Sequence, residues 1–404
     1  MVNTCCFIND AKEESVNTIL EMAEYKKTGS CKVLVVTGCM AQRYKNEIIE
    51  EVPEVDAVLG TTSYGDILKA IREAMEGKHF QEFKDIDYLP EKLGKRVLTT
   101  GGHFGYLKIA EGCDKHCTYC IIPKLRGKFR SVPMERLVTQ AKEMAEEGVK
   151  ELILVAQETT VYGTDIYGKK SLHILLKELC KIKGIRWIRV LYCYPEEIYD
   201  ELIQTMKEEK KICHYLDLPI QHASDRILKR MGRRTTQAEL VEIVNKLRRE
   251  IPDIVLRTTL ISGFPGETQE DHEELMGFVD EMEFDRLGVF TYSPEEDTPA
   301  ATMPDQVAEE VKEARRDEIM ELQQEISYDK GTDRIGQELL VMIEGKVADE
   351  SAYIGRTYGD APKVDGYIFV QTGELLMTGD FAKVRVTGAL EYDLIGELAD
   401  EYTE

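Results

Sequence analysis

The chain has 404 residues, 43% of them hydrophobic, and a formal net charge of −23. Its length allows two or three globular domains, and its composition excludes an intrinsically disordered chain. The sequence has no apolar run of about 18 residues, which a membrane-spanning helix needs. Residues 1–7 lack the basic region of a signal peptide, so we expect a cytoplasmic protein.

The acidity of the chain bears on its partners. A strongly negative protein repels phosphate backbones at long range, so nucleic acid is a disfavoured partner. A basic protein or a small molecule is favoured instead. The alternative is that the charge only keeps the protein soluble.

The first 76 residues predict an α/β domain. Residues 1–4 have the character of the end of a strand, and short β-branched runs predict buried strands at residues 33–37 and 57–60. Helical periodicity predicts helices at residues 11–25, 41–51 and 64–75. The polar residues 77–98 that follow predict a linker.

Residues 99–330 predict a larger set of β/α units. Short apolar runs predict six strands, at residues 106–110, 151–156, 187–192, 215–218, 254–260 and 286–290. Helical patterns lie between them, at residues 134–147, 172–182, 197–208, 237–250 and 268–281. Parallel strands with crossover helices form a full or partial (β/α) barrel. Residues 305–330 predict one long charged helix, with Arg315 and Arg316 on its solvated face.

The pattern changes to short strands with glycine-containing turns near the C-terminus. We expect strands at residues 339–344, 367–370, 381–387 and 392–397, which predict a small all-β barrel over residues 333–400. Residues 335–404 contain 5 Lys and Arg against 14 Asp and Glu, a net charge of −9. The barrel is therefore more acidic than the chain as a whole.

Three of the ten cysteines are tightly clustered, in the order Cys113-x3-Cys117-x2-Cys120 on a loop after a predicted strand. Clustered thiols in a chain without an export signal indicate a metal site more than disulfides. A [4Fe–4S] cluster normally takes four thiolates, so three leave one iron open, to which the amino and carboxylate groups of S-adenosylmethionine (SAM) can bind. Two alternatives are a zinc site with His116 as fourth ligand and three unrelated cysteines.

The segment Cys113-Asp-Lys-His-Cys-Thr-Tyr-Cys-Ile-Ile-Pro-Lys-Leu-Arg-Gly127 resembles the signature of the radical SAM methylthiotransferases. Asn3-Thr-Cys5 and Thr37-Gly-Cys-Met-Ala-Gln42 resemble two motifs with which that family binds a second [4Fe–4S] cluster. The resemblance implies three parts: a partial flavodoxin-like α/β domain at residues 1–76, a radical SAM core at 99–330 and a TRAM-like barrel at 333–400.

The resemblance also implies the cofactors, which are two [4Fe–4S] clusters and SAM. Cys113, Cys117 and Cys120 are the implied ligands of the first cluster. Cys5 and Cys39 are the implied ligands of the second, whose third ligand belongs to a family segment that precedes Asn3 and is missing here. We therefore expect a chain truncated at its N-terminus, in which the second cluster either is incomplete or takes Cys6 as a substitute ligand.

The family divides by substrate into two branches. Three stretches resemble the RimO-type branch, which modifies an aspartate of ribosomal protein twelve of the small subunit: residues 192–197, 218–225 and 354–366. The alternative is the MiaB-type branch, which modifies an adenosine of tRNA. The acidic barrel is independent support for the first branch, since it suits a basic ribosomal protein. An electron donor is a further implied partner.

The implied reaction joins two uses of SAM. Cleavage of SAM at the first cluster yields a radical that removes a hydrogen from the β-carbon of the substrate aspartate. The second cluster then delivers sulfur that another SAM has methylated, so the protein mainly orients its cofactors.

Four further residues are candidate SAM contacts. Tyr119 could lie against the adenine or pack as an ordinary loop aromatic. Gln157 and Gln221, each following a predicted strand, could bind SAM or be satisfied loop residues. Arg257 could pair with the SAM carboxylate or with a carboxylate of the barrel.

Overall fold

The computed structural model describes residues 1–90 and 97–399. The chain divides into two compact units. We call the first the cysteine unit; it comprises Met1–Arg96, Glu111–Arg130 and Ser293–Pro304. The second, the sheet unit, comprises Val97–Ala110, Ser131–Tyr292 and Asp305–Glu404. Within the described ranges, every helix is too short or too polar to cross a membrane.

The cysteine unit is built on a parallel sheet in the order β1-β2-β3-β4. Its strands are β1 (Val2–Thr4), β2 (Val35–Gly38), β3 (Ala57–Leu59) and β4 (Phe80–Glu82). Its helices are α1 (Asn9–Thr28), α2 (Cys39–Tyr44), α3 (Glu47–Glu51), η1 (Tyr64–Asp66), α4 (Ile67–Met75), α5 (Ile122–Arg126) and η3 (Pro299–Thr302). The helix predicted at residues 41–51 is two helices, because Lys45 has a φ of +46°. Strand β4 lies in the predicted linker.

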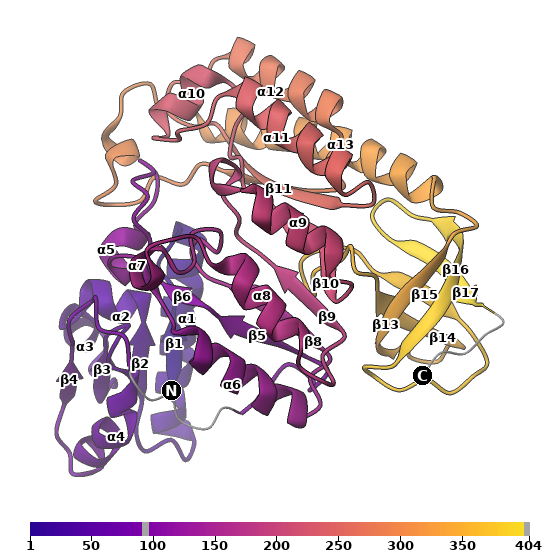
Figure 1. The fold of residues 1–404 in the computed structure, drawn as a ribbon. Coiled ribbons are helices and arrows are strands. Elements are labelled where there is room, and N and C mark those ends of the chain that lie inside the picture. The colour runs from indigo at the N-terminus through magenta and orange to yellow at the C-terminus, as the bar shows by residue number, and fades with distance from the viewer. Residues whose placement is uncertain (91–96, 400–404) are drawn as a thin grey trace. The chain divides into compact units, whose positions relative to one another are not determined.

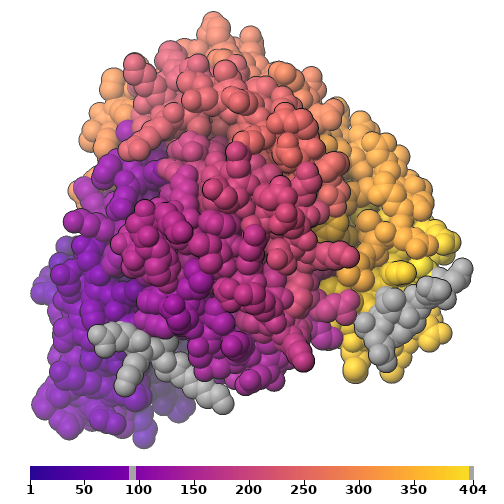
Figure 2. Space-filling model, in the orientation of Figure 1, coloured from indigo at the N-terminus to yellow at the C-terminus, as the bar shows by residue number. Residues whose placement is uncertain are grey.

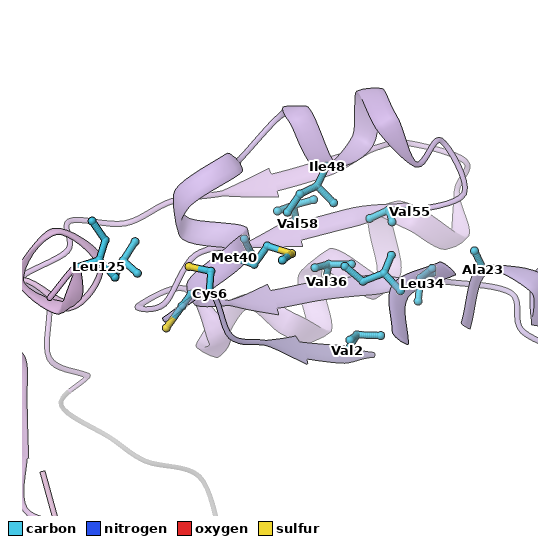
Figure 3. Close-up of a cluster of buried hydrophobic side chains, with 14 residues drawn as sticks. Val2, Cys6, Ala23, Leu34, Val36, Met40, Ile48, Val55, Val58 and Leu125 are labelled. Atoms are coloured by element: carbon cyan, nitrogen blue, oxygen red, sulfur yellow. The ribbon is translucent and has the colours of Figure 1, made fainter. Parts of the chain in front are cut away.

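Short apolar side chains of this sheet form one core with residues from the cysteine loop. Val36 and Val58 on neighbouring strands are fully buried, and Leu125 of α5 packs into the same cluster (Figure 3). Burying such side chains contributes roughly 1.5–3 kcal/mol each. The helix after the cysteine triplet is thus anchored in the core of this unit.

The sheet unit contains six parallel strands in the order β12-β11-β10-β9-β8-β5 (Figure 1). They are β5 (Phe104–Lys108), β8 (Glu151–Val155), β9 (Trp187–Val190), β10 (Ile212–Asp217), β11 (Val255–Ser262) and β12 (Arg286–Thr291). The sheet is open, so the predicted α/β class is confirmed and the barrel is a partial one. Two short strands, β6 (Ala110–Glu111) and β7 (Arg130–Ser131), lie at the ends of the cysteine loop.

Crossover helices connect these strands, and α6, α8 and α9 pack along the sheet (Figure 1). The helices are α6 (Met134–Glu146), α7 (Thr164–Tyr167), α8 (Leu172–Cys180), η2 (Pro195–Glu197), α9 (Asp200–Glu208), α10 (Asp225–Arg230), α11 (Gln237–Glu250), α12 (Gln269–Met282) and α13 (Glu309–Thr332). Helix α11 begins with a capping box in which Thr236 and Glu239 bond each other's backbone N–H. Such caps fix where the helices begin.

A closed five-stranded barrel ends the chain, in the order β13-β14-β15-β17-β16. Its strands are β13 (Glu338–Lys346), β14 (Ala352–Arg356), β15 (Ile368–Gln371), β16 (Phe381–Ala389) and β17 (Leu394–Leu398). The sequence predicted all of these except β14. Figure 2 shows the yellow surface of the barrel adjoining the orange surface of α13, which contacts β16.

The barrel packs directly on the sheet. The Trp187 and Phe381 rings lie edge to face with centroids 4.9 Å apart, and Met342 joins the same buried cluster. Aromatic pairs of this kind contribute about 0.5–1.5 kcal/mol beyond the area they bury. The barrel and the sheet therefore form one folded body.

Buried charges reinforce this contact. Glu151 of β8 accepts hydrogen bonds from Arg189 at 2.8 Å and from Arg356 of the barrel at 2.7 Å, and all three side chains are almost completely buried. Burial alone would raise the pKa of Glu151, but the charges of Arg356 and Arg189 outweigh burial and lower it. Arg356 also pairs with Glu344 at 2.6 Å.

Candidate active site

The cysteine triplet lies on the loop that the sequence predicted, between β6 and α5. Cys113 and Cys117 are buried and Cys120 is partly buried. The N–H of Cys113 donates to the carbonyl of Gly127 at 3.1 Å, which closes the base of the loop. Gly112 has a φ of +77°, and a Cβ there would lie 2.1 Å from the carbonyl oxygen of Lys128. Only glycine fits at this position.

An aspartate from the predicted linker also holds the loop in place. Asp87 Oδ1 accepts hydrogen bonds from the N–H of Lys128 at 2.8 Å and from Arg130 Nη1 at 3.1 Å. A cavity of about 230 Å³ opens beside Cys113, lined in part by Asp87, His116 and Lys128. No local pattern in the sequence indicates a role for Asp87, because its partners are more than 40 positions away.

The thiols of the triplet influence one another. Burial raises the pKa of Cys120 to about 12, with the charges of Cys117 and Cys113 acting in the same direction and a hydrogen bond from the Ile122 backbone acting against them. A bound metal cation has to displace these protons, since cysteine ligates as the thiolate. Three clustered thiols of this kind are a donor set that fits three irons of a [4Fe–4S] cluster. Within the described residues, no three His, Cys, Asp or Glu side chains converge to hold a single metal ion.

The sheet of the cysteine unit brings Cys5 and Cys39 to the same edge. Thr4 of β1 pairs with Gly38 of β2 in parallel register, and each is the last residue of its strand, so a cysteine directly follows the carboxyl end of both strands. Gly38 has a φ of +102°, and a Cβ there would lie 2.3 Å from the carbonyl oxygen of Thr4. Cys5 is exposed and Cys39 is buried.

Cys6 is fully buried in the apolar core (Figure 3), whereas the adjacent Cys5 is exposed. Burial raises the pKa of Cys6 to about 11, with the charge of Cys39 acting in the same direction and Arg43 acting against both. Its role as a substitute ligand stays a prediction.

One arginine links the two cysteine groups. Arg126, the last residue of α5, donates from Nη2 to Cys39 Sγ at 3.2 Å and lies 3.6 Å from Glu111 Oε2. The sequence placed Arg126 inside the family signature but assigned it no role. Arg126 lies beside Cys39 only because α5 packs against the N-terminal part of the unit, so the contact could not be predicted from the sequence.

In the sheet unit, Gln157 and Gln221 follow strands β8 and β10 at their carboxyl ends, as the sequence predicted. Gln157 Oε1 is buried and has no hydrogen-bond partner within residues 97–399 or 1–90. Gln221 has a φ of +73° and bridges to Leu260 of β11. The unpaired oxygen of Gln157 suits a ligand that brings a donor, since buried polar atoms are seldom left unsatisfied.

Arg257 pairs with carboxylates of its own unit, the second of its two predicted alternatives. Nη1 donates to Asp217 Oδ1 at 2.8 Å, and Nε lies 3.4 Å from Asp365 Oδ1. This pairing disfavours a contact of Arg257 with SAM. Tyr119 is partly buried in the cysteine loop.

One expectation for α13 is wrong. Arg315 is not on a solvated face but is buried, with its guanidinium 2.9 Å from the buried carboxylate of Glu267. Arg316 does lie at the surface, beside Asp317.

Family models match three parts of the chain. The model described as Radical SAM superfamily matches residues 107–279, TRAM domain matches residues 335–399, and Uncharacterized protein family UPF0004 matches residues 1–60. The ribosomal protein uS12 methylthiotransferase RimO of Lachnoclostridium phytofermentans is 66% identical over 396 residues, which are 98% of this chain and 90% of that protein.

The chain belongs to the RimO family of ribosomal protein uS12 methylthiotransferases. The RimO proteins of Clostridium perfringens and Clostridioides difficile are 54% and 50% identical, each over 99% of this chain and 90% of the relative. These relatives confirm the RimO-type branch over the MiaB-type alternative. As a radical SAM family, it uses a [4Fe–4S] cluster and SAM.

Two solved structures share the fold. They are of the radical SAM methyltransferase TsrM from Kitasatospora setae, one with tryptophan substrate and a SAM analogue and one with cobalamin and a [4Fe–4S] cluster bound. Their TM-scores are 0.52 and 0.53, at 14% and 13% identity, over 70% of this chain and 59% of theirs. At this identity the likeness concerns the fold alone.

Proposed function

We propose that the chain adds a methylthio group to the β-carbon of an aspartate in ribosomal protein uS12. The observation that carries this proposal is the 66% identity to a RimO protein over 98% of the chain, together with the cysteine triplet on its loop. Three proposed domains divide the work: residues 1–76, the radical SAM core at 99–330 and the barrel at 333–400.

Cys113, Cys117 and Cys120 would hold the first cluster. When bound, that cluster supplies the electron that cleaves SAM and so gives access to a radical able to remove an unactivated hydrogen. The chain's own residues fix the geometry: Gly112 closes the loop, and Asp87 holds its far end. Gln157 would accept a hydrogen bond from SAM, and Tyr119 and Gln221 remain candidate contacts.

Cys5 and Cys39 would be two ligands of a second cluster. Their positions at the ends of adjacent strands, and Arg126 beside Cys39, support this role. A guanidinium within hydrogen-bonding distance stabilises negative charge on sulfur. Arg126 would therefore hold the anionic thiolate of Cys39 and orient it.

The substrate protein would dock on the barrel. Several of the barrel's acids are used internally: Glu344 pairs with Arg356, Asp360 with Arg286, and Asp365 with Arg257. Others face solvent, namely Glu338, Asp349, Glu350, Glu374, Glu391 and Glu397. The exposed basic residues of the described barrel are fewer: Lys346, Lys363 and Arg385. A surface with this excess attracts a basic protein and repels wrong partners.

Anaerobic reconstitution with iron and sulfide, followed by incubation with SAM, a reductant and uS12, tests the activity. Mass spectrometry should find one methylthio group in place of one hydrogen on an aspartate of uS12. A tRNA adenosine modified in place of uS12 would refute the proposal. A protein that binds zinc and shows no iron–sulfur absorbance would refute it as well.

Docking is tested separately from chemistry. Replacing Glu374, Glu391 and Glu397 by Gln should weaken uS12 binding in calorimetry and flatten its dependence on salt. Cleavage of SAM without substrate should not change. A control variant replaces three exposed acids outside the barrel by Gln, on helices α11 and α12: Glu242, Glu273 and Glu274. An equal loss of uS12 affinity in both variants would contradict a specific docking surface on the barrel.

A further inference from the structure

Tyr192 has a backbone conformation that an aromatic residue rarely adopts. Its φ is +59°, and it is the sole aromatic with a positive φ in residues 1–90 and 97–399. Bulky residues are outliers in the left-handed region, and such a conformation costs roughly 1–3 kcal/mol. It persists only where the surrounding structure enforces it.

Three hydrogen bonds enforce it. The N–H of Tyr192 donates to Asp217 Oδ2 at 3.1 Å. Its carbonyl oxygen accepts from the N–H of Thr159 at 3.0 Å and from Thr159 Oγ1 at 3.1 Å. Arg257 in turn holds Asp217 at 2.8 Å. The Arg257–Asp217 pair, in which Asp217 is buried and Arg257 partly buried, therefore supports the strained backbone.

The strained backbone presents the ring to solvent. Tyr192 is 48% exposed, whereas its neighbours Leu191 and Cys193 are 8% and 0% exposed. Its hydroxyl has no hydrogen-bond partner within the described ranges. Tyr192 comes two residues after the end of β9, at the edge where β/α folds place their chemistry.

We propose that Tyr192 contacts the protein substrate, its ring packing on the peptide and its hydroxyl donating a hydrogen bond to the aspartate carboxylate. This rests on the proposed function, which supplies the carboxylate. A phenol is suited to the task because it offers apolar area and one donor at little cost in side-chain entropy. Asp217 and Thr159 are positioning residues that act through Tyr192.

Calorimetric binding of uS12 to the reconstituted enzyme tests this without turnover. Tyr192→Phe should raise the Kd for uS12 about tenfold, as expected for a lost hydrogen bond to a charged group. Tyr192→Asn, which tolerates the left-handed region, should weaken binding more while its Tm is not lowered. The KM for SAM and substrate-free SAM cleavage should stay at wild-type values in both variants. Tyr328→Phe is the matched control, since Tyr328 is 49% exposed on α13.

Two results would overturn the inference. One is an unchanged Kd for uS12 in both Tyr192 variants. The other is a rise in the KM for SAM, which would place the ring against the cofactor. Failure of the proposed function is a different result: the wild-type enzyme would then leave uS12 unmodified in the mass spectrum.

Discussion

The cysteine unit and the sheet unit depend on polar side chains in different ways. In the cysteine unit, Cys113, Cys117 and Cys120 lie within eight consecutive residues, as ligands of one cluster require. In the sheet unit, Glu151 meets partners 38 and 205 positions away, Arg189 and Arg356. Ligand spacing is a local property of the chain, whereas a buried ion pair is a property of the completed fold.

Removing a proposed ligand should have the largest effect. Cys117→Ala should lower iron content and iron–sulfur absorbance to the contribution of the second cluster and abolish SAM cleavage, because a first cluster with two remaining thiolates is not held. Iron and sulfide analysis after reconstitution measures the first, and 5′-deoxyadenosine formation the second. Cys180→Ala is the control, a cysteine on α8 of the sheet unit. Equal iron content in the two variants would contradict the assignment.

This contrast explains what the sequence could predict. The six strands of the sheet unit, the cysteine triplet and the C-terminal barrel follow from periodicity and spacing. Strand β14 was missed because its residues Ala352–Arg356 include a glycine and a buried arginine, which do not read as an apolar run. Asp87 and Arg126 were missed because their partners lie on other elements, and for the same reason the sequence left two alternatives open for the partner of Arg257. The expected exposure of Arg315 failed for the same reason: Glu267 lies 48 positions away.

Breaking the buried network should destabilise the sheet unit strongly. Glu151→Gln leaves Arg189 and Arg356 without their shared anion, which costs about 3–5 kcal/mol. Urea unfolding followed through Trp187, the single tryptophan, reports on this contact. Glu143→Gln, at an exposed site of α6, should change the free energy of unfolding by less than about 0.5 kcal/mol. A comparable midpoint in both variants would contradict the role of the network.

Arg257→Met separates its two predicted roles. Losing the guanidinium leaves the buried Asp217 without its cation, so we expect a loss of about 3 kcal/mol in stability. Direct loss of a SAM contact would instead raise the Kd for SAM in a fully folded protein. Calorimetry with SAM and urea unfolding distinguish the two. Unchanged stability with weaker SAM binding would instead support a pair between Arg257 and the SAM carboxylate.

Acid should weaken the sheet unit through the same carboxylates. The pKa values of Glu151 and Glu344 are lowered in the folded protein, by nearby arginines in the first case and by His103 and Arg356 in the second, against burial. The two carboxylates stabilise the folded state fully when the pH is above 4.5, the ordinary pKa of glutamate. This stabilisation is lost as the pH falls below 4.5 toward the lowered pKa values of the folded protein. The urea midpoint should therefore be flat from neutral pH to about pH 5 and fall below that. The urea midpoint of the Glu151→Gln variant should fall less steeply as the pH is lowered.

The smallest effect should come from an ion pair of similar length on the same barrel. Arg385 of β16 lies 2.8 Å from Glu338, with both side chains nearly half exposed, whereas Arg356 of β14 lies 2.6 Å from Glu344 and is 1% exposed. Exposed pairs contribute about 0.2–1 kcal/mol because water and salt screen them. Arg385→Met should therefore shift the urea midpoint slightly, and 1 M salt should remove the difference from wild type, since the screening length is then about 3 Å. Arg356→Met should cost several-fold more and keep that cost in salt, because the pair is shielded from solvent. If the two variants were equally destabilised, the N–O distance and not burial would determine the strength of these pairs.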